Sequence, residues 1–274
     1  MAWLRLEGAV YWALFVGTFL AVAVWESFHP KRALSSPAER RWSRHAMLLL
    51  ISGVVQTAIL RVTPPVVAWW ARDNPFGILN RPWMPLLAAW IACFLLLDLV
   101  RYAMHWAFHS FYFLWRVHEV HHSDPDFDVS TAGRFHPLEV VSTQAFYLAT
   151  IALFAPPPVA VFAAELLALA LNLFAHANAS LPDWVERVLR TILITPDLHR
   201  IHHSEEIVEQ SRNFGQTFPW WDRLFGTYLG KPAAGEEGLT TGIKGLQDDR
   251  SLGVGFMLTE PFRARYESET GTAA

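Results

Sequence analysis

The stretch at residues 98–122 reads DLVRYAMHWAFHSFYFLWRVHEVHH and follows directly on a long apolar segment. Within it, four polar side chains are spaced at i, i+4, i+7 and i+11, so a helix would align them on one narrow stripe. They are Asp98, Tyr102, His105 and His109. Such a stripe can present two imidazoles to a single metal ion.

A second histidine pattern follows after a short aromatic turn. His118, His121 and His122 are spaced at i, i+3 and i+4, which places two or three imidazoles on one helix face. The same spacing returns late in the chain, at His199, His202 and His203. Two triplets and an earlier pair predict a cluster that holds more than one metal ion.

Single histidines have a more ordinary interpretation. His29 and His45 flank apolar segments near arginines, and we interpret them as hydrogen-bonded surface or core residues. The clustered histidines differ, because three groups with helical spacing occur in a chain with one cysteine and no other metal motif. This pattern favours metal ligation over chance.

The composition is that of a membrane protein. Hydrophobic residues make up 53% of the 274 positions, and there are 13 tryptophans. Cys93 is the single cysteine, which excludes an intramolecular disulfide and a thiolate-based metal site, so the metal ligands must be nitrogen or oxygen. A net charge of -3 and the lack of a basic run exclude an electrostatic case for nucleic-acid binding.

Five apolar runs predict an all-α membrane bundle of four to five helices. They are residues 8–28, 47–70, 84–105, 140–155 and 159–174. The first run lacks the cationic start and the cleavage site of a secretory signal, so we expect it to be retained. The last two are short for full spans and are separated by three prolines, which predicts a tight hairpin, whether or not it crosses completely.

The charges around the first two runs predict the orientation in the membrane. The loop between them carries five basic residues against one acidic residue: Lys31, Arg32, Arg40, Arg41 and Arg44 against Glu39. The positive-inside rule makes this loop cytoplasmic, and the parity of the spans brings His105 and His109 to the same face. Arg61 interrupts the second run; it is either functional or, as we favour near a helix end, snorkels to the interface.

Several further residues are expected to support the metal ions. Asp98 lies deep in an apolar helix on the histidine stripe and is expected to accept a hydrogen bond from an imidazole N–H. Tyr102 on the same stripe and Asp222 in the later aromatic segment NFGQTFPWWDRLFGTY are expected to help orient the ligands. The hairpin returns His176 to the other histidines, and Asn172 one turn earlier is a possible weak or water-linked ligand.

Two segments outside the apolar runs carry further predictions. Residues 123–139, SDPDFDVSTAGRFHPLE, form either a solvated connection or a lid, with His136 as a possible extra ligand or proton carrier. From residue 180 onward the chain is soluble in character, and we expect one or two helices lying against the membrane, followed by a surface tail at 231–274. Five apolar side chains there would face the core or the interface: Trp184, Val188, Leu189, Ile192 and Leu193.

Nine histidines fit the pattern, which is too many for one ion and about right for two. They are His105, His109, His118, His121, His122, His176, His199, His202 and His203. Imidazole suits zinc, copper, iron and nickel, so ligand type alone does not name the metal, although a closed structural zinc site would normally use thiolates. A dinuclear iron site beside a lipid-accessible pocket would make use of the membrane, because it could bind O₂ and oxidise an unactivated C–H bond.

The order of HWAFH, HEVHH, the single histidine of FAHAN, and HRIHH resembles the fatty acid hydroxylase superfamily, also called the sterol desaturase family. The flanking strings, WWDRLFGTY among them, are similar to its bacterial members. The resemblance covers residues 98–228, as the catalytic region of a single membrane-embedded domain at 1–274. It implies a cytosolic centre of two iron ions, with O₂ as co-substrate, that hydroxylates, desaturates or cleaves an ether bond of a lipid. It carries the ligand role over to the eight histidines of the three boxes and to His176.

The resemblance also bears on partners. No fused haem domain of the cytochrome b5 type is visible, so electrons are expected from a separate ferredoxin, cytochrome b5-like protein or reductase. The substrate stays open among sterols or hopanoids, fatty acyl lipids, ornithine-type lipids and carotenoids, and the oligomeric state stays open too. The expected location is the bacterial inner membrane. The alternatives are an inactive relative, against which the complete set of boxes argues, and a divalent-metal transporter or metal-binding protein, although transporters usually place ionisable ligands at mid-membrane on broken helices.

Overall fold

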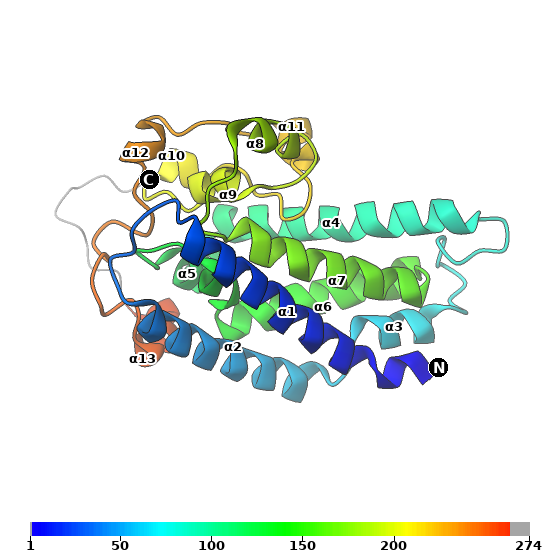
Figure 1. The fold of residues 1–274 in the computed structure, drawn as a ribbon. Coiled ribbons are helices and arrows are strands. Elements are labelled where there is room, and N and C mark those ends of the chain that lie inside the picture. The colour runs from blue at the N-terminus through cyan, green and yellow to red at the C-terminus, as the bar shows by residue number, and fades with distance from the viewer. Residues whose placement is uncertain (1, 264–274) are drawn as a thin grey trace.

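The computed structural model describes residues 2–263, and the regular elements in this part of the chain are all helices, without a β-strand (Figure 1). Five helices in it are long and apolar enough to cross a membrane. They are α1 (Glu7–Phe28), the pair α2 (Ala38–Leu60) and α3 (Pro64–Ala71) taken together, α4 (Leu86–Ser110), α6 (Pro137–Phe154) and α7 (Pro158–Ala175). The chain is therefore a multi-pass membrane protein, and the predicted all-α bundle is confirmed.

The second span is broken rather than continuous. α2 ends at Leu60, Arg61 takes a left-handed conformation with φ 56°, and Pro64 and Pro65 begin α3. Proline fits the first turn of a helix but not its interior, so the pair starts a new helix instead of extending the old one. Arg61 lies exposed at the end of α2, in the position from which a side chain snorkels.

α4 carries the histidine stripe on one unbroken helix, as predicted. Its 25 residues span about 37 Å, more than the roughly 30 Å of a bilayer core, so one end must project from the apolar layer. Phe111 then adopts an extended conformation and redirects the chain into α5 (Tyr112–His122). The turn brings the second group of histidines back beside the first.

α6 and α7 are consecutive apolar helices as predicted, but the expected tight hairpin is wrong, because each packs against α3 and α4 instead of closely against the other. Each has 18 residues, and Ala155 turns the chain between them with φ 48°. Small side chains line the contacts between α3, α6 and α7, among them Ala68, Ala160 and Ala164, all almost fully buried. Close approach over small residues is the usual way in which membrane helices pack.

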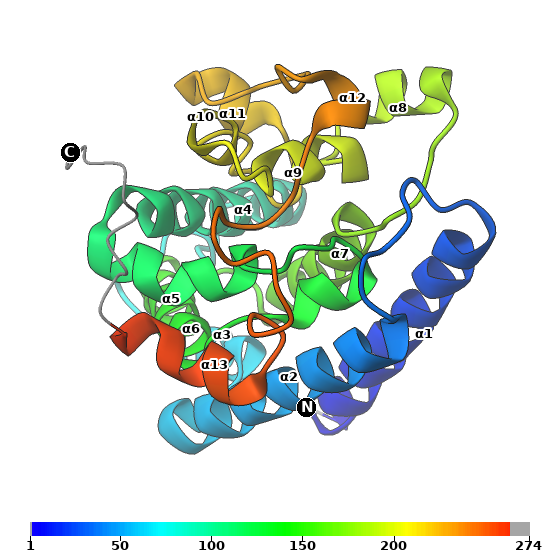
Figure 2. The same cartoon turned by 90° about the vertical axis from the view of Figure 1, so that its left-hand side faces the viewer.

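The shorter helices gather at one end of the bundle (Figures 1 and 2). They are η2 (Val129–Gly133), α8 (Asp183–Leu189), α9 (Pro196–His202), α10 (Ile207–Gln210), α11 (Trp220–Phe225), α12 (Gly235–Gly238), α13 (Val254–Thr259) and η3 (Glu260–Phe262), while η1 (Ala2–Arg5) precedes α1. Together, α8 to α12 form a cap beside α4. The predicted surface tail from residue 231 needs correction in its described part, because Leu252 and Met257 are fully buried and α13 packs against α2. Residues 264–274 of that tail lie outside the described residues.

Candidate metal centre

Four segments bring the nine predicted histidines together, and each delivers them from the end of a helix. α4 and α5 carry theirs in their last two turns, His176 is the C-cap of α7, and the third triplet occupies the last turn and C-cap of α9. Thr195 begins α9 by accepting a hydrogen bond from the backbone N–H of Leu198. Helix C-termini carry partial negative charge, so their convergence favours a bound cation.

The nine imidazoles form two groups, each of which could hold a metal ion, with ligand atoms that lie within 4.8 Å of one another. The five-histidine group consists of His105, His109, His118, His122 and His202. The four-histidine group consists of His121, His176, His199 and His203. Neighbours in sequence fall into different groups because successive helical residues point about 100° apart. The arrangement agrees with the prediction of a cluster larger than one ion.

The ring nitrogens are placed as ligands of an ion would be. Nε2 atoms face each other at 3.2 Å between His118 and His122, and at 3.0 Å between His176 and His199. Metal–imidazole bonds of roughly 2.0–2.1 Å put neighbouring ligand nitrogens about 3 Å apart. Seven further buried ring nitrogens have no hydrogen-bond partner among the described residues: Nε2 of His105, His109, His202 and His203, and Nδ1 of His121, His122 and His199. Unpaired buried nitrogens are costly, and metal ligation would satisfy those that face the two groups.

Burial keeps these imidazoles neutral. It lowers the pKa of His118 to about 3 and the pKa of His176 to about 4. Both rings are therefore uncharged at neutral pH, which is the form that binds a metal ion.

Four histidines are oriented through Nδ1 by a fixed acceptor. Backbone carbonyl oxygens lie 2.8 Å from Nδ1 of His105 (Phe214), 2.7 Å from that of His202 (Arg212) and 2.8 Å from that of His176 (Asn172). The fourth acceptor is Glu139, whose Oε1 lies 2.6 Å from Nδ1 of His118. A hydrogen bond donated by Nδ1 fixes the tautomer and leaves the Nε2 lone pair for a metal ion.

Glu139 was not among the residues predicted to support the site. It is buried at the start of α6, a candidate membrane helix. An ionisable residue at the edge of an apolar run could have indicated a role, because such residues are costly in a membrane without a partner. Its partner, 21 positions earlier, could not be found from local spacing.

The three residues that were predicted to support the site act less directly than Glu139. Asp98 accepts a hydrogen bond from Trp221 Nε1 at 2.9 Å, so its observed partner is an indole and not the expected imidazole. Asp222 accepts from the backbone N–H groups of Phe214 and Gly215, both at 2.8 Å, and thereby holds the peptide whose carbonyl meets His105. Tyr102 reaches Asp222 through the hydroxyl of Thr227, at 3.0 Å and then 2.7 Å.

The two possible extra ligands have separate outcomes. His136 is outside both groups; its Nδ1 accepts from Leu138 N–H at 3.2 Å and caps α6, so the proposed ligand role is wrong for this arrangement. Asn172 donates to the carbonyl of Ala132 at 3.2 Å and lines a cavity of about 10 Å³ between the groups, room for roughly one water.

His45 is a buried, hydrogen-bonded residue as interpreted, with Ser130 Oγ 2.8 Å from its Nδ1.

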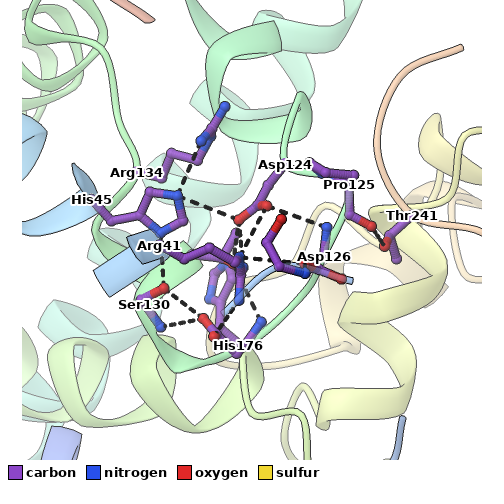
Figure 3. Close-up of polar contacts among 12 residues, drawn as sticks. Arg41, His45, Asp124, Pro125, Asp126, Ser130, Arg134, His176 and Thr241 are labelled. Atoms are coloured by element: carbon purple, nitrogen blue, oxygen red, sulfur yellow. Dashed lines mark hydrogen bonds and ion pairs between the residues drawn. The ribbon is translucent and has the colours of Figure 1, made fainter. Parts of the chain in front are cut away.

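The polar segment 123–139 is a buried wall of the site and not a solvated connection. Arg41 from α2 binds Asp124 at 2.6 Å and also pairs with Asp128 (Figure 3). Burial alone would raise the pKa of Asp124, but Arg41 and the neighbouring cations hold it below its usual range. The Phe135 ring of this segment stacks on His121 with centroids 4.3 Å apart.

The comparisons with known proteins agree with this geometry. The family profile described as fatty acid hydroxylase matches residues 90–227, about half of the chain and all four histidine-bearing segments. Alkylglycerol monooxygenase of Homo sapiens is 30% identical over 160 residues, covering 56% of this chain and 33% of that protein. Ornithine lipid hydroxylase OlsE of Rhizobium tropici is 32% identical over 173 residues, covering 61% and 48%.

The match to a more distant relative covers a larger share of that relative. Methylsterol monooxygenase 1 of Danio rerio is 25% identical over 194 residues, covering 69% of this chain and 63% of that protein. The chain thus spans about a third to two thirds of the length of these relatives. No solved structure matches the chain significantly. The profile match over half of the sequence decides the classification: the chain belongs to the fatty acid hydroxylase family.

Proposed function

We propose that this protein is an O₂-dependent membrane lipid hydroxylase whose nine histidines hold two iron ions. The observation that carries the proposal is the pair of buried imidazole groups, one of five and one of four histidines. All-imidazole ligation suits several metals, and the names of the relatives, monooxygenases and hydroxylases, favour a redox-active metal over zinc. Residues 98–228 would form the catalytic region.

Bound iron would supply the activation of O₂ for oxidation of a C–H bond. The residues of the chain prepare the site for that chemistry. Glu139 and the carbonyl of Phe214 hold the rings of His118 and His105 in one tautomer. Phe127, stacked 5.5 Å from His176, and Phe135 close the site with apolar rings that exclude water.

The substrate class follows from the site and from the relatives. The histidines emerge at one end of the spanning helices, within reach of a lipid in the adjoining leaflet. The relatives are named for alkylglycerol, ornithine lipid and methylsterol. We propose that the substrate is a membrane lipid with a C–H bond at a saturated carbon, of the fatty acyl, ornithine-type, sterol, hopanoid or carotenoid class. Hydroxylation is favoured over desaturation.

Hydroxylation places one oxygen atom of O₂ in the product and releases the other as water, so electrons and protons must be supplied. We propose a separate donor, a ferredoxin, a cytochrome b5-like protein or a reductase, that approaches the metal-site side. The basic loop between α1 and α2 lies on that side, where Lys31 pairs with Asp197 in the first turn of α9 at 3.0 Å. By the positive-inside rule we place this side in the cytoplasm of a bacterial inner membrane.

The proposal is tested on protein purified from cells grown on iron-57. Elemental analysis should find about two irons per chain, and Mössbauer spectroscopy should find them coupled and oxidised on exposure to O₂. Lipid extracts of cells with and without the protein, compared by mass spectrometry, should then differ by one added oxygen. A single zinc per chain, or no iron after iron-replete growth, would instead favour a metal-binding or transport role.

A further inference from the structure

The cap exposes a set of large apolar side chains on α8, on α11 and in the turn after α8. They are Trp184, Val188, Ile192, Trp220, Leu224 and Phe225, which we call the cap patch. Trp184 and Leu224 are each 69% exposed. The two helices are tied together, because Trp220 Nε1 donates to the carbonyl of Thr191 at 3.1 Å and Arg223 donates to that of Arg190 at 2.8 Å. A soluble surface rarely leaves so many large apolar residues together in water.

Contacts with α4 fix the depth of the patch. Trp221 of α11 donates to Asp98, and Phe225 stacks on Tyr102 with centroids 5.4 Å apart. At about 1.5 Å per residue, Asp98 lies roughly 18 Å and Tyr102 roughly 24 Å along α4 from its first residue, Leu86.

The start of α4 already faces lipid, since Leu86 and Leu87 are about 70% exposed in its first turn. A hydrocarbon core of about 30 Å that begins there ends roughly 6–12 Å beyond the level of Tyr102 and Asp98. α11 therefore lies beside α4 at a level inside the leaflet (Figure 1).

We propose that the cap patch is embedded in the leaflet on the metal-site side and anchors the cap in the plane of the membrane. Its occupant is lipid hydrocarbon, continuous with the lipid around the outer face of α4. The depth matches that of in-plane amphipathic helices, which sink about 5–10 Å into the boundary between headgroups and acyl chains. Arg187, exposed on α8, has a side chain long enough to reach the lipid phosphates from this depth.

The anchor would couple the bilayer to the metal ligands. The segment before α11 supplies the carbonyls of Arg212 and Phe214 that hold His202 and His105, and Asp222 of α11 holds the Phe214 peptide. This inference depends on the spanning helices and not on the proposed reaction.

The chain offers a matched control on the same cap. Ile207 of α10 is 76% exposed and also apolar. α10 packs against α9. In Figure 1, α10 lies farther than α11 from the start of α4. If exposure alone governed the surroundings of a side chain, Ile207 and Leu224 would behave alike.

The test is site-directed spin labelling of the full chain in nanodiscs of phosphatidylcholine and phosphatidylglycerol. Cys93 is fully buried, and Cys93→Ala gives a clean background for Leu224→Cys, Val188→Cys and Ile207→Cys. We expect nitroxides at positions 224 and 188 to collide with O₂ several-fold more than with a water-soluble nickel complex, and a nitroxide at 207 to show the reverse. Size-exclusion elution equal to that of the parent protein confirms that each variant is folded.

Two outcomes would overturn the proposal. Nickel accessibility at 224 and 188 equal to that at 207 would place the patch in water. Shielding from both reagents, together with a dimer in nanodisc sizing, would assign the patch to a second copy of the chain. Neither outcome depends on whether the protein hydroxylates a lipid.

Discussion

At the scale of single residues, Glu139 is the one side-chain carboxylate in hydrogen-bonding distance of a clustered histidine among the described contacts. Its Oε1 lies 2.6 Å from His118 Nδ1, and both groups are buried. A carboxylate in this position raises the basicity of the imidazole and fixes the ring, and removal of such partners usually costs about 10–100-fold in metal affinity.

We therefore expect Glu139→Ala to lose metal about 10–100-fold more readily than the parent protein in dialysis against a graded chelator. Glu139→Gln should lie between the two, because its amide oxygen can still accept the hydrogen bond without the charge. Ser142→Ala, one turn later on α6, is the control and should retain metal normally. Equal retention in all three variants would show that Glu139 does not support the site.

The adjacent residues His202 and His203 provide a test of the two-group arrangement. His202 belongs to the five-histidine group and His203 to the four-histidine group. His203→Ala leaves three imidazoles for one ion, whereas His202→Ala leaves four for the other. We expect His203→Ala to retain about one metal per chain and His202→Ala to retain nearly two, by elemental analysis. Loss of both ions in each variant would mean that the two groups do not hold their ions separately.

At the scale of elements, the histidine boxes were predictable because helical period alone decides which side chains share a face. The spacing along α4 and α5 therefore predicted histidines that the fold brings together in two groups. The carbonyls of Arg212 and Phe214 were not predictable, since any residue type carries a carbonyl and only the tertiary fold directs it. The same limit applies to Asp98, whose indole partner lies 123 positions away.

The segment 123–139 could not be assigned from sequence for a related reason. Its aspartates normally indicate a solvated loop, but Arg41 lies 83 positions away in sequence and compensates the charge of Asp124 inside the protein. Asp126 is also satisfied, by the backbone N–H groups of Ser35 and Ser36 at 2.8 and 3.0 Å. Burial of such charges is possible only when each finds a partner, and local sequence does not contain the partners.

Arg41 is accordingly expected to control the stability of this wall. Arg41→Ala would leave Asp124 and Asp128 buried without their cation, which typically costs about 3–5 kcal/mol. Arg40→Ala is the matched control, because Arg40 pairs with Asp249 at the exposed surface and should cost about 0–1 kcal/mol. Unfolding in detergent, followed by tryptophan fluorescence, measures both. A similar small effect for the two arginines would contradict the role of Arg41.

The buried wall at 123–139 is expected to lose stability in acid. The pKa of Asp124 in the folded protein lies below its ordinary value of 3.8, so the folded state binds fewer protons than the unfolded chain around that pH. The contribution of Asp124 to stability is therefore complete above about pH 4 and is lost as the pH falls through the folded pKa. Asp124→Asn should remove most of this acid dependence in an unfolding series from pH 5 to pH 2, and an unchanged slope of stability against pH would exclude this role of Asp124.

At the scale of the whole molecule, hydropathy predicted the five spans because a bilayer demands about 20 apolar residues for each crossing. It did not predict that α13 would pack against α2, because the tail is polar on average and its buried apolar residues, such as Leu239, Leu252 and Met257, are widely spaced. The cap was predicted only in part. Five of its apolar residues were expected to face either the core or the interface, and three of them, Trp184, Val188 and Ile192, lie exposed.

The order of the helices has a consequence for topology. α1 runs from the N-terminal side to the metal-site side, α2 and α3 return, and α4 crosses again to deliver His105 and His109. The turn between α3 and α4, which contains Asn80, must then lie on the opposite side from the metal site. The loop after α1 packs on the metal-site cap through Lys31 and Asp197, and its basic residues favour the cytoplasmic side.

We therefore expect Asn80→Cys and Glu237→Cys, both at exposed positions, to react differently with a membrane-impermeant maleimide in intact bacterial cells. Asn80→Cys should be labelled from outside, because the proposed orientation puts its turn in the periplasm. Glu237→Cys on α12 should be labelled only after permeabilisation, since the proposed orientation puts the cap, the metal site and the basic loop together in the cytoplasm. The native Cys93 is buried and should stay unreactive in both variants, so it serves as the internal control. The opposite labelling pattern would place the metal site outside the cytoplasm, where a cytoplasmic reductase could not deliver electrons, and it would require a different donor.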